Sequence, residues 1–167
     1  FRNEDYWARP VPGFGDKNAR VLVIGLAPGA HGANRTGRVF TGDRSGDFLI
    51  SAMHAEGFAN RPVAQHAKDP LRLIDSYLTN AVRCAPPNNR PTALEIRECG
   101  GFLETELAAL TQVQVVLTLG KFSFDAFWRL VAKRGIAPSR KPHFAHGSIF
   151  TQTKNLVPHL VASYHPS

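Results

Sequence analysis

Cysteine is scarce in this chain, which has only Cys84 and Cys99 in 167 residues. Small secreted proteins stabilised by disulfides carry many more cysteines, so the composition argues against that class and favours an intracellular protein. Structural zinc and iron–sulfur sites normally take four ligands, so two thiols alone do not make one. No apolar run reaches the length of a transmembrane helix, and no signal peptide is recognisable.

Acidic residues are also in deficit. The sequence has 13 Asp and Glu against 20 Lys and Arg, which gives a formal net charge of +7. A basic protein gains affinity for polyanions such as nucleic acids, because its cations replace the counterions condensed on phosphates. The alternative is a basic protein without such a partner, and the net charge fits both interpretations equally well.

The length and the 43% hydrophobic content predict one domain with its own core over residues 1–167. We find no internal repeat and no linker that would divide the chain. The first residue is Phe1 rather than Met, and the last residue directly follows Tyr164-His165-Pro166. We therefore expect the sequence to be trimmed at both ends.

Short apolar runs alternate with helical patterns along the chain. Strands are predicted at residues 21–24, 76–82, 113–119 and 160–163, with a short one at 148–152. Helices are predicted at 45–56, with Ser45 as N-cap, at 92–110 and at 121–133. The second begins with a Thr92–Glu95 capping box and is expected to be interrupted or loosened near Gly100-Gly101. Residues 1–20, 58–70 and 135–148 have irregular patterns. This alternation predicts an α/β fold with a largely parallel sheet covered on both faces.

The segment between the first strand and the first helix, Gly25 to Asp43, has the composition of a binding loop. Its nineteen residues, GLAPGAHGANRTGRVFTGD, include five glycines. Glycine lets a ligand approach the backbone closely, and a long ordered loop in a compact domain usually has a function. A phosphate-binding α/β enzyme is a weaker alternative, because the loop lacks both the G-x-G-x-x-G and the P-loop spacing.

Three unusual segments each follow a predicted strand. They are the glycine loop, the proline-rich segment Cys84–Pro91 and His165. Ligands of parallel α/β sheets bind beyond the carboxyl ends of the strands, so we expect these segments to meet at one edge. Several arginines lie in or beside these segments and strengthen the nucleic-acid interpretation: Arg35, Arg38, Arg44, Arg83 and Arg90.

The polar and aromatic residues of these segments each allow two interpretations. Asp43 is either a helix-entry residue at the positive end of the dipole or a carboxylate that activates water. His165 is either a surface histidine or a donor to an oxygen that becomes anionic. Asn80 either ties down a loop or binds a ligand, since a buried amide needs a partner. Asn89 is a turn residue or a contact to phosphate or base, and Phe40 belongs to the core or stacks on a base.

The remaining histidines carry weaker signals. His31 is interpreted as an ordinary loop residue on its sequence position alone. His143 and His146 have no spacing that would indicate a metal site.

Three motifs, in this order along the chain, resemble those of family 5 (type B) uracil-DNA glycosylases. They are Gly25–Asp43, Val82-Arg83-Cys84-Ala85-Pro86-Pro87 and Ser163-Tyr164-His165-Pro166-Ser167. Residues 6–16, YWARPVPGFGD, are also similar to the family, so the resemblance covers nearly the whole chain. It implies a three-layer αβα sandwich around a four-stranded parallel sheet. It also implies an enzyme that flips uracil, and often hypoxanthine, out of duplex DNA and cleaves the N-glycosidic bond to leave an abasic site.

The resemblance implies catalytic roles for two residues. His165 would face the carbonyl oxygen of the base and stabilise the negative charge that develops on departure. Asp43 would activate water and stabilise the oxocarbenium ion. Most related families carry Asn or Asp at the position of Ala27, where it handles the water, so its absence shifts this role to Asp43.

The resemblance also implies positions that bind the base or the DNA. Phe40 would stack on the flipped base, and Asn80 matches an asparagine that reads a pyrimidine edge in the sister family 4. Asn89 matches a position near the lesion or a phosphate. Residues 163–167 would open the loop that wedges into the duplex. The other implied base- or DNA-binding positions are Gly25, Ala27, Gly29, Ala30, His31 and Asn34.

The family carries a 4Fe–4S cluster on four cysteines. Cys84 and Cys99 match the third and fourth, and the first two would lie upstream of Phe1. The resemblance therefore implies a cluster in the full-length protein and leaves it open for residues 1–167. The implied partner is double-stranded DNA with deaminated bases, bound by a cytoplasmic monomer at a bacterial or archaeal nucleoid. The rival hypothesis is a catalytically silent nucleic-acid-binding domain of the same fold, because the cluster ligands and the C-terminal segment are incomplete.

Overall fold

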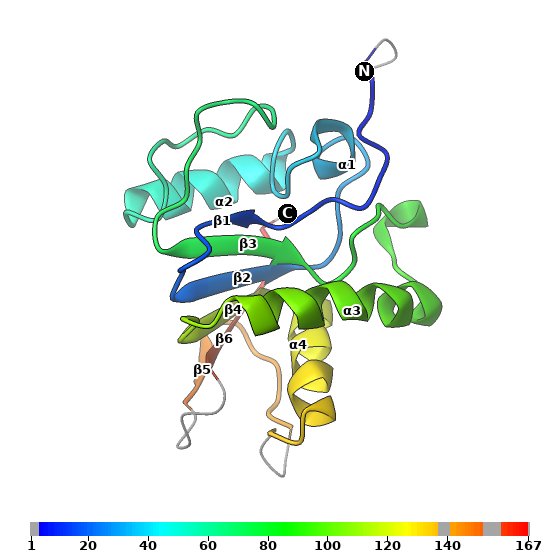
Figure 1. Ribbon diagram of the computed structural model, residues 1–167, viewed down its shortest axis with the longest axis vertical. Helices are drawn as coiled ribbons and strands as arrows, with labels where there is room; N and C mark the ends of the chain where they lie inside the picture. The colour runs from blue at the N-terminus through cyan, green and yellow to red at the C-terminus, as the bar shows by residue number, and fades with distance from the viewer. Residues whose placement is uncertain (1–3, 137–140, 152–157, 167) are drawn as a thin grey trace.

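The computed structural model describes residues 4–136, 141–151 and 158–166. Their strands form one six-stranded sheet in the order β1-β3-β2-β4-β6-β5 (Figure 1). The strands are β1 (Phe14–Gly15), β2 (Val21–Gly25), β3 (Ser76–Asn80), β4 (Val115–Leu119), β5 (Ser148–Phe150) and β6 (His159–Ser163). The four central strands, β3, β2, β4 and β6, are parallel to one another, as predicted. The two short outer strands, β1 and β5, each pair antiparallel with their neighbour.

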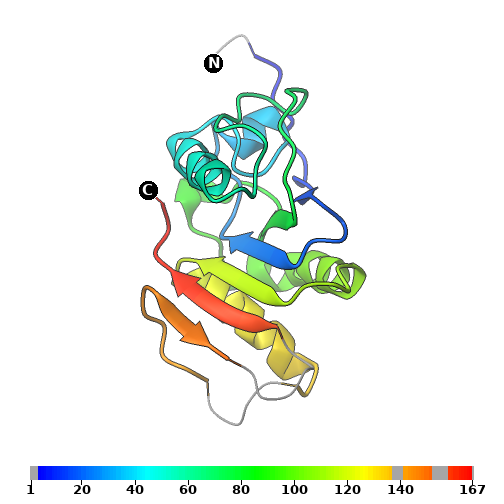
Figure 2. The ribbon, with the colours of Figure 1, turned by 90° about the vertical axis from the view of Figure 1, so that its left-hand side faces the viewer.

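Helices cover the sheet on both faces, so the prediction of a three-layer α/β sandwich is confirmed (Figures 1 and 2). The α-helices are α1 (Ala33–Thr36), α2 (Arg44–Ala55), α3 (Ala93–Ala109) and α4 (Lys121–Lys133), and a 3-10 turn η1 spans Pro87–Asn89. In Figure 1, α1 and α2 lie on one side of the sheet, and α3 and α4 lie on the other.

Strand β2, at the centre of the sheet, has no polar side chain, as expected for a strand buried on both faces. Alternate side chains of β2 point to opposite faces of the sheet and pack into two different hydrophobic cores. Val23 packs with Leu49, Ile50 and Met53 of α2 and with Leu78 of β3. The other core receives Leu22 and Ile24 of β2 and joins them to side chains of α3, α4, β4 and β6, including Leu103, Phe124, Phe127, Val116 and Leu160. The two packed cores fix the sheet and leave its carboxyl edge for loops.

Most predicted elements are present, with corrections at their ends. The N-cap of α2 is Asp43 rather than Ser45, because the Asp43 carboxylate accepts a hydrogen bond from the backbone N–H of Gly46. The capping box of Thr92 and Glu95 is confirmed. The prediction of a loosened turn at residues 100–101 is wrong, since α3 continues without a break through Ala109.

Other boundaries shift by small amounts. Strand β3 ends at Asn80 rather than at residue 82, and β4 begins at Val115 rather than at residue 113. The short strand β1 and the short helix α1, which lies in the glycine loop, were not predicted, because two to four residues give no periodicity to detect. The predicted strand at 148–152 forms over Ser148–Phe150, and residue 152 lies outside the described residues.

Candidate active site

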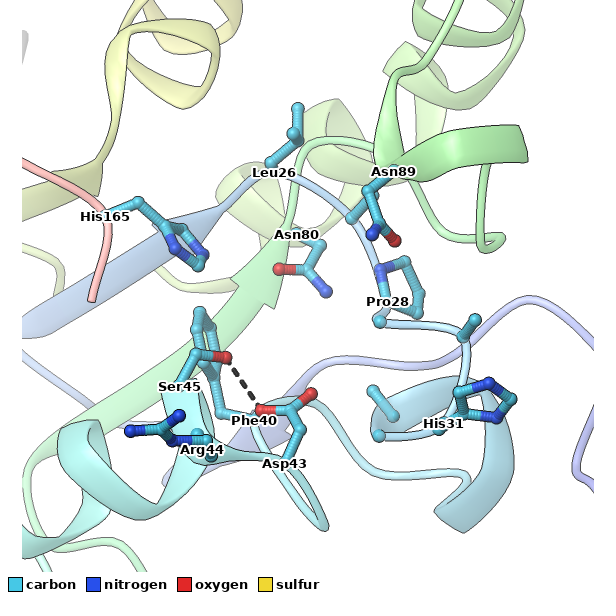
Figure 3. A pocket seen from close by; sticks show the side chains of 15 residues that line it. Leu26, Pro28, His31, Phe40, Asp43, Arg44, Ser45, Asn80, Asn89 and His165 are labelled. Atoms are coloured by element: carbon cyan, nitrogen blue, oxygen red, sulfur yellow. Dashed lines mark hydrogen bonds between the residues drawn. The ribbon is translucent and has the colours of Figure 1, made fainter. Parts of the chain in front are cut away.

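The three unusual segments of the sequence meet at the carboxyl edge of the sheet. They enclose a cavity of about 600 Å³, shown in Figure 3. Its lining comes from the glycine loop, the start of α2, the end of β3, η1 and the segment after β6. The lining residues are Leu26, Ala27, Pro28, Gly29, Ala30, His31, Gly32, Ala33, Phe40, Asp43, Arg44, Ser45, Asn80, Asn89 and His165.

Asp43 uses its two carboxylate oxygens differently. Oδ1 accepts a hydrogen bond from the Gly46 N–H at 2.9 Å and another from the Ser45 hydroxyl at 2.7 Å (Figure 3). These bonds cap α2 and hold the carboxylate at the positive end of the helix, where a negative charge is stabilised. The helix-entry interpretation of Asp43 is therefore confirmed through Oδ1, and Oδ2 takes no part in the cap.

The second carboxylate oxygen lies against the glycine loop. A methyl group built on Gly32 would overlap Oδ2 of Asp43, and one built on Gly29 would approach it to 2.9 Å. Both distances are shorter than real carbon–oxygen contacts allow. The glycines are therefore required here by close approach, which brings Asp43 against the loop backbone.

Asn80 and Phe40 form the floor of the cavity around Gly25. Only 3% of Asn80 and 6% of Phe40 is exposed, and a methyl group on Gly25 would collide with both side chains. Among the described residues, no hydrogen bond of the Asn80 amide is found. In Figure 3 the amide points into the cavity, and its atoms are not among the fully buried, unpaired side-chain atoms of the described residues.

His165 enters the cavity from the other end of the chain. In Figure 3 its ring and the Asp43 carboxylate lie at different sides of the cavity, and the Asn80 amide lies to one side of both. The surrounding protein removes water from the ring and lowers its pKa, while the negative charge of Asp43 acts in the opposite direction. Because the net shift is downward, the imidazole is neutral at neutral pH and offers one N–H donor.

The remaining predicted residues differ in how near they come to the cavity. Asn89 lines it from η1 with a left-handed backbone (φ 55°). His31 also lines it, and its Nδ1 lies 2.6 Å from the Tyr6 hydroxyl of the N-terminal segment. Asn34 is outside the lining, and its amide donates to the Ala30 carbonyl at 3.4 Å. Gly25, which the resemblance implied as a base- or DNA-binding position, is outside the lining, and its missing side chain leaves room for Asn80 and Phe40.

Leu26, Pro28, Gly32 and Ala33 of the glycine loop line the cavity but were not among the predicted site residues, and the same holds for Arg44 and Ser45, which directly follow Asp43. Arg44 and Ser45 have a role of their own. They belong to the first turn of α2, and Ser45 donates the hydrogen bond that orients Asp43. The signal in the sequence was their position directly after Asp43. Because Ser45 was predicted to be the N-cap of the helix, it was not predicted to be a site residue.

A buried polar network holds the segment after β3. Arg83 is 4% exposed, donates to the Val11 carbonyl at 2.7 Å and forms an ion pair with Glu106 of α3. Glu106 also accepts hydrogen bonds from Thr79 at 2.6 Å and Tyr77 at 3.2 Å. Burial and the Glu106 charge raise the pKa of Tyr77 to about 12, so its hydroxyl stays a donor. This network fixes the direction in which the chain leaves β3 toward Cys84 and Asn89.

The two cysteines lie beside this segment, outside the cavity lining. Cys84 is exposed, Cys99 is half-buried on α3, and neither forms a disulfide. Loss of water raises the pKa of Cys84, and the charges of Cys99 and Glu95 raise it further. Cys84 and Cys99 are thus electrostatic neighbours. The described part of the chain contains no group of three or more His, Cys, Asp or Glu side chains that could hold a metal ion.

Comparison with known proteins decides the family. Residues 12–167 match the model of the Uracil DNA glycosylase superfamily. The chain belongs to this superfamily. All 167 residues align with a protein named type-5 uracil-DNA glycosylase from Thermus thermophilus at 51% identity, covering 73% of that protein. A protein of the same name from Mycobacterium leprae is 44% identical over the whole chain and is covered to 71%.

More distant members of the uracil-DNA glycosylase superfamily align with part of the chain. A type-4 uracil-DNA glycosylase from Archaeoglobus fulgidus is 33% identical over 121 residues, which are 72% of this chain and 53% of that protein. None of the helices in the described ranges is long and apolar enough to cross a membrane.

Proposed function

We propose that this chain is a type-5 uracil-DNA glycosylase, which removes uracil from DNA by hydrolysing the N-glycosidic bond and leaves an abasic site. The observation that carries the proposal is the pair of Asp43 and His165 at different sides of a cavity floored by Asn80. Two relatives that carry this name support it, at 51% and 44% identity over the full chain.

The target base reaches the cavity by flipping out of the DNA stack, which costs a few kcal/mol. The cavity of about 600 Å³ has room for a nucleobase and its sugar. Phe40 offers a ring for stacking, and the Asn80 amide offers a donor and an acceptor to the edge of the base. In this proposal the base forms hydrogen bonds with the Asn80 amide while it stacks on Phe40.

The chemical step separates charge, and the two ends of the cavity match that separation. As the C1′–N bond breaks, positive charge develops on the sugar and negative charge on the leaving base. Asp43 Oδ2 stabilises the cation and accepts a proton from the water whose oxygen bonds to C1′. The N–H of neutral His165 donates to the base oxygen and stabilises the leaving anion, which later takes up a proton.

Ala27 supports this assignment by exclusion. Its methyl group lines the cavity and can neither orient nor deprotonate water. Asp43 is the remaining carboxylate of the lining, and its cap bonds through Ser45 and Gly46 hold it rigidly. Rigid placement is what gives such a group its effect on rate.

We also propose hypoxanthine as a second substrate. A deaminated purine exposes a carbonyl where its parent base has an amino group, and the His165 and Asn80 donors suit a carbonyl. Single-turnover assays on otherwise identical duplexes with uracil, hypoxanthine or adenine test this selectivity. Cleavage of the uracil duplex alone would restrict the activity to pyrimidines.

The partner is double-stranded DNA with a deaminated base, bound by a monomer in the cytoplasm of a bacterium or archaeon. The net charge of +7 supports a polyanionic partner. Binding through phosphate contacts releases counterions, so affinity should fall steeply as salt is raised. A salt-independent affinity would argue against a DNA groove, and sedimentation of the DNA complex would give the stoichiometry.

We further propose that Cys84 and Cys99 supply two of the four ligands of a 4Fe–4S cluster, with the other two outside residues 1–167. Cys99 lies near enough to Cys84 for its charge to raise the pKa of Cys84. Two thiolates that bind the same small cluster must lie close together in this way. A bound cluster would tie the segment after β3 to α3. Iron content and visible absorbance of the full-length protein and of its Cys84→Ser and Cys99→Ser variants test this. Unchanged iron content in both variants would exclude these two ligands.

The alternative is a catalytically silent nucleic-acid-binding domain of the same fold. A duplex with one uracil, compared with the same duplex containing thymine and developed with alkali, separates the two. Strand cleavage at uracil only is the expected result. Binding of both duplexes without cleavage by the full-length protein would leave the silent domain as the answer.

A further inference from the structure

The edge strand β5 and the turn before it lie outside the cavity lining. Both lie beside β6, the strand that leads to His165. In Figure 2, β5 runs next to β6 at the edge of the sheet. The turn closes with a 3.2 Å hydrogen bond from the Ser148 N–H to the Ala145 carbonyl. Gly147 has φ 74°, a conformation that glycine adopts without strain. Its N–H donates to the Ala162 carbonyl of β6 at 2.8 Å.

This anchored turn presents His146 to the residue before His165. The His146 Nδ1 atom accepts a hydrogen bond from the backbone N–H of Tyr164 at 3.1 Å. The two rings stack, with centroids 4.9 Å apart and planes at 21°. The Ser163 hydroxyl also lies 3.3 Å from Nδ1. The imidazole is therefore held by the turn on one side and by β6 on the other.

A second hydrogen bond holds the same stretch from the opposite neighbour of β6. The Gly120 N–H, at the end of β4, donates to the Ser163 carbonyl at 2.7 Å. Successive backbone groups at the end of β6 are thus fixed from β4 and from the turn before β5. Beyond these two bonds the chain continues directly into His165 and Pro166.

We propose that His146 is a positioning residue for glycosidic bond cleavage, a proposal that rests on the function inferred above. Its Nδ1 lone pair holds the Tyr164 N–H and thereby sets the direction in which His165 enters the cavity. The short strand β5 contributes by pairing with β6, which holds the turn of His146 against that strand. His146 is not among the residues that line the cavity, so in this proposal it acts through the backbone of its neighbour.

The direction of the hydrogen bond fixes the chemical form of the ring. A backbone N–H can only donate, so Nδ1 must carry a lone pair and the proton must be on Nε2. The spacing of His146 indicated no metal site, and its hydrogen bond to the backbone of Tyr164 could not be predicted, because residue spacing does not reveal a backbone partner. The hydrogen-bond acceptor of His146 and its aromatic ring can therefore be removed separately by substitution.

Two variants of His146 separate its acceptor from its ring. His146→Asn places an amide oxygen near the Nδ1 position and loses the stack, whereas His146→Phe keeps a ring and loses the acceptor. We expect His146→Phe to slow single-turnover uracil release about tenfold and His146→Asn to stay within about threefold of the unchanged protein. Affinity for a uracil duplex should change less than about twofold in both, because no DNA contact is removed.

An equal loss of rate in both variants, or an unchanged rate in His146→Phe, would overturn the proposal. Weakened duplex binding with an unchanged chemical step would assign the ring stack to DNA contact instead and would also overturn it. Thermal unfolding of each variant identifies any that fails to fold. If a variant fails to fold, or if the unchanged protein is inactive, the proposal is tested on the unchanged protein instead. A long-range ¹H–¹⁵N spectrum shows which ring nitrogen of His146 carries the proton. Unprotonated His146 Nδ1 at pH 8 is required, and a proton on that atom would contradict the proposal.

Discussion

The carboxylate of Asp43 lies against the backbone of Gly32, so closely that a methyl group on Gly32 would overlap Oδ2. Gly32→Ala must therefore push Asp43 out of place while leaving its charge intact. We expect single-turnover uracil release to fall at least about tenfold, because small misplacements of a catalytic group have large effects on rate.

A matched control for this change exists on α3. Gly101 is helical, and a methyl group there would meet nothing within 4 Å. Gly101→Ala should leave the rate unchanged and raise the unfolding free energy by about 0.5–1 kcal/mol, since alanine favours a helix. Equal rates in the Gly32 and Gly101 variants would show that the close approach has no role in catalysis.

Asp43 has a structural and a chemical task, and two substitutions distinguish them. Asparagine is as good an N-cap as aspartate, so Asp43→Asn should unfold at nearly the same temperature. Asp43→Ala loses the cap and should lose about 1 kcal/mol of stability. Both lack the carboxylate, and both should cleave at least about a hundredfold more slowly. Retained activity in the stable Asn variant would remove Asp43 from the chemical step.

The pKa of His165 reports its environment in the folded protein. Loss of water lowers it below its ordinary value of 6.5, and Asp43 partly opposes that shift. The unfolded chain therefore binds a proton first as pH falls below 6.5, so this histidine reduces stability as pH drops from there toward its folded pKa. NMR titration should give a midpoint below 6.5 and a still lower one in Asp43→Asn. A higher midpoint in that variant would contradict the facing arrangement.

The glycine loop depends on a buried ion pair for its stability. Arg38 and Asp69 are 4% and 3% exposed and lie 2.8 Å apart. Burial alone would raise the pKa of Asp69, but hydrogen bonds from backbone N–H groups and Arg38 lower it to about 2. The carboxylate therefore contributes about 2 kcal/mol above pH 3.8, and this is lost as pH falls through about 2.

Asp69→Asn should lower the unfolding free energy at pH 7 by about 3–5 kcal/mol, because it leaves Arg38 buried without its partner. Urea unfolding at pH 7 and at pH 3 measures both effects. The exposed pair of Arg20 and Asp75 provides a control, and Asp75→Asn should change stability much less. A similar loss in the two variants would show that burial of the first pair has no special weight.

The strands of the central sheet could be predicted from the sequence because each is marked by a short apolar run of neighbouring residues. Val21 to Ile24 are continuously apolar, and such a run forms a strand buried on both faces. The meeting of the glycine loop, Asn89 and His165 was also predictable, since parallel strands place their following loops at one edge. The capping box of Thr92 was predictable because its side chains bond within four residues.

Contacts between distant segments could not be predicted in this way. The division of the Asp43 carboxylate between Gly46 and Gly32 depends on the fold of the loop, and no pattern of residues encodes it. The bond from Tyr164 to His146 joins a backbone donor to a side chain across eighteen positions. The catalytic roles themselves came from resemblance to a family rather than from spacing.

The most direct test measures the release of free uracil from a labelled duplex in a single turnover, with the full-length protein in excess. We compare the unchanged protein with its Asp43→Asn and His165→Ala variants at pH 7.5, and we measure duplex affinity in parallel. The account predicts rapid release by the unchanged protein, release at least about a hundredfold slower in each variant, and affinities within a few fold. Undiminished release by both variants would contradict it.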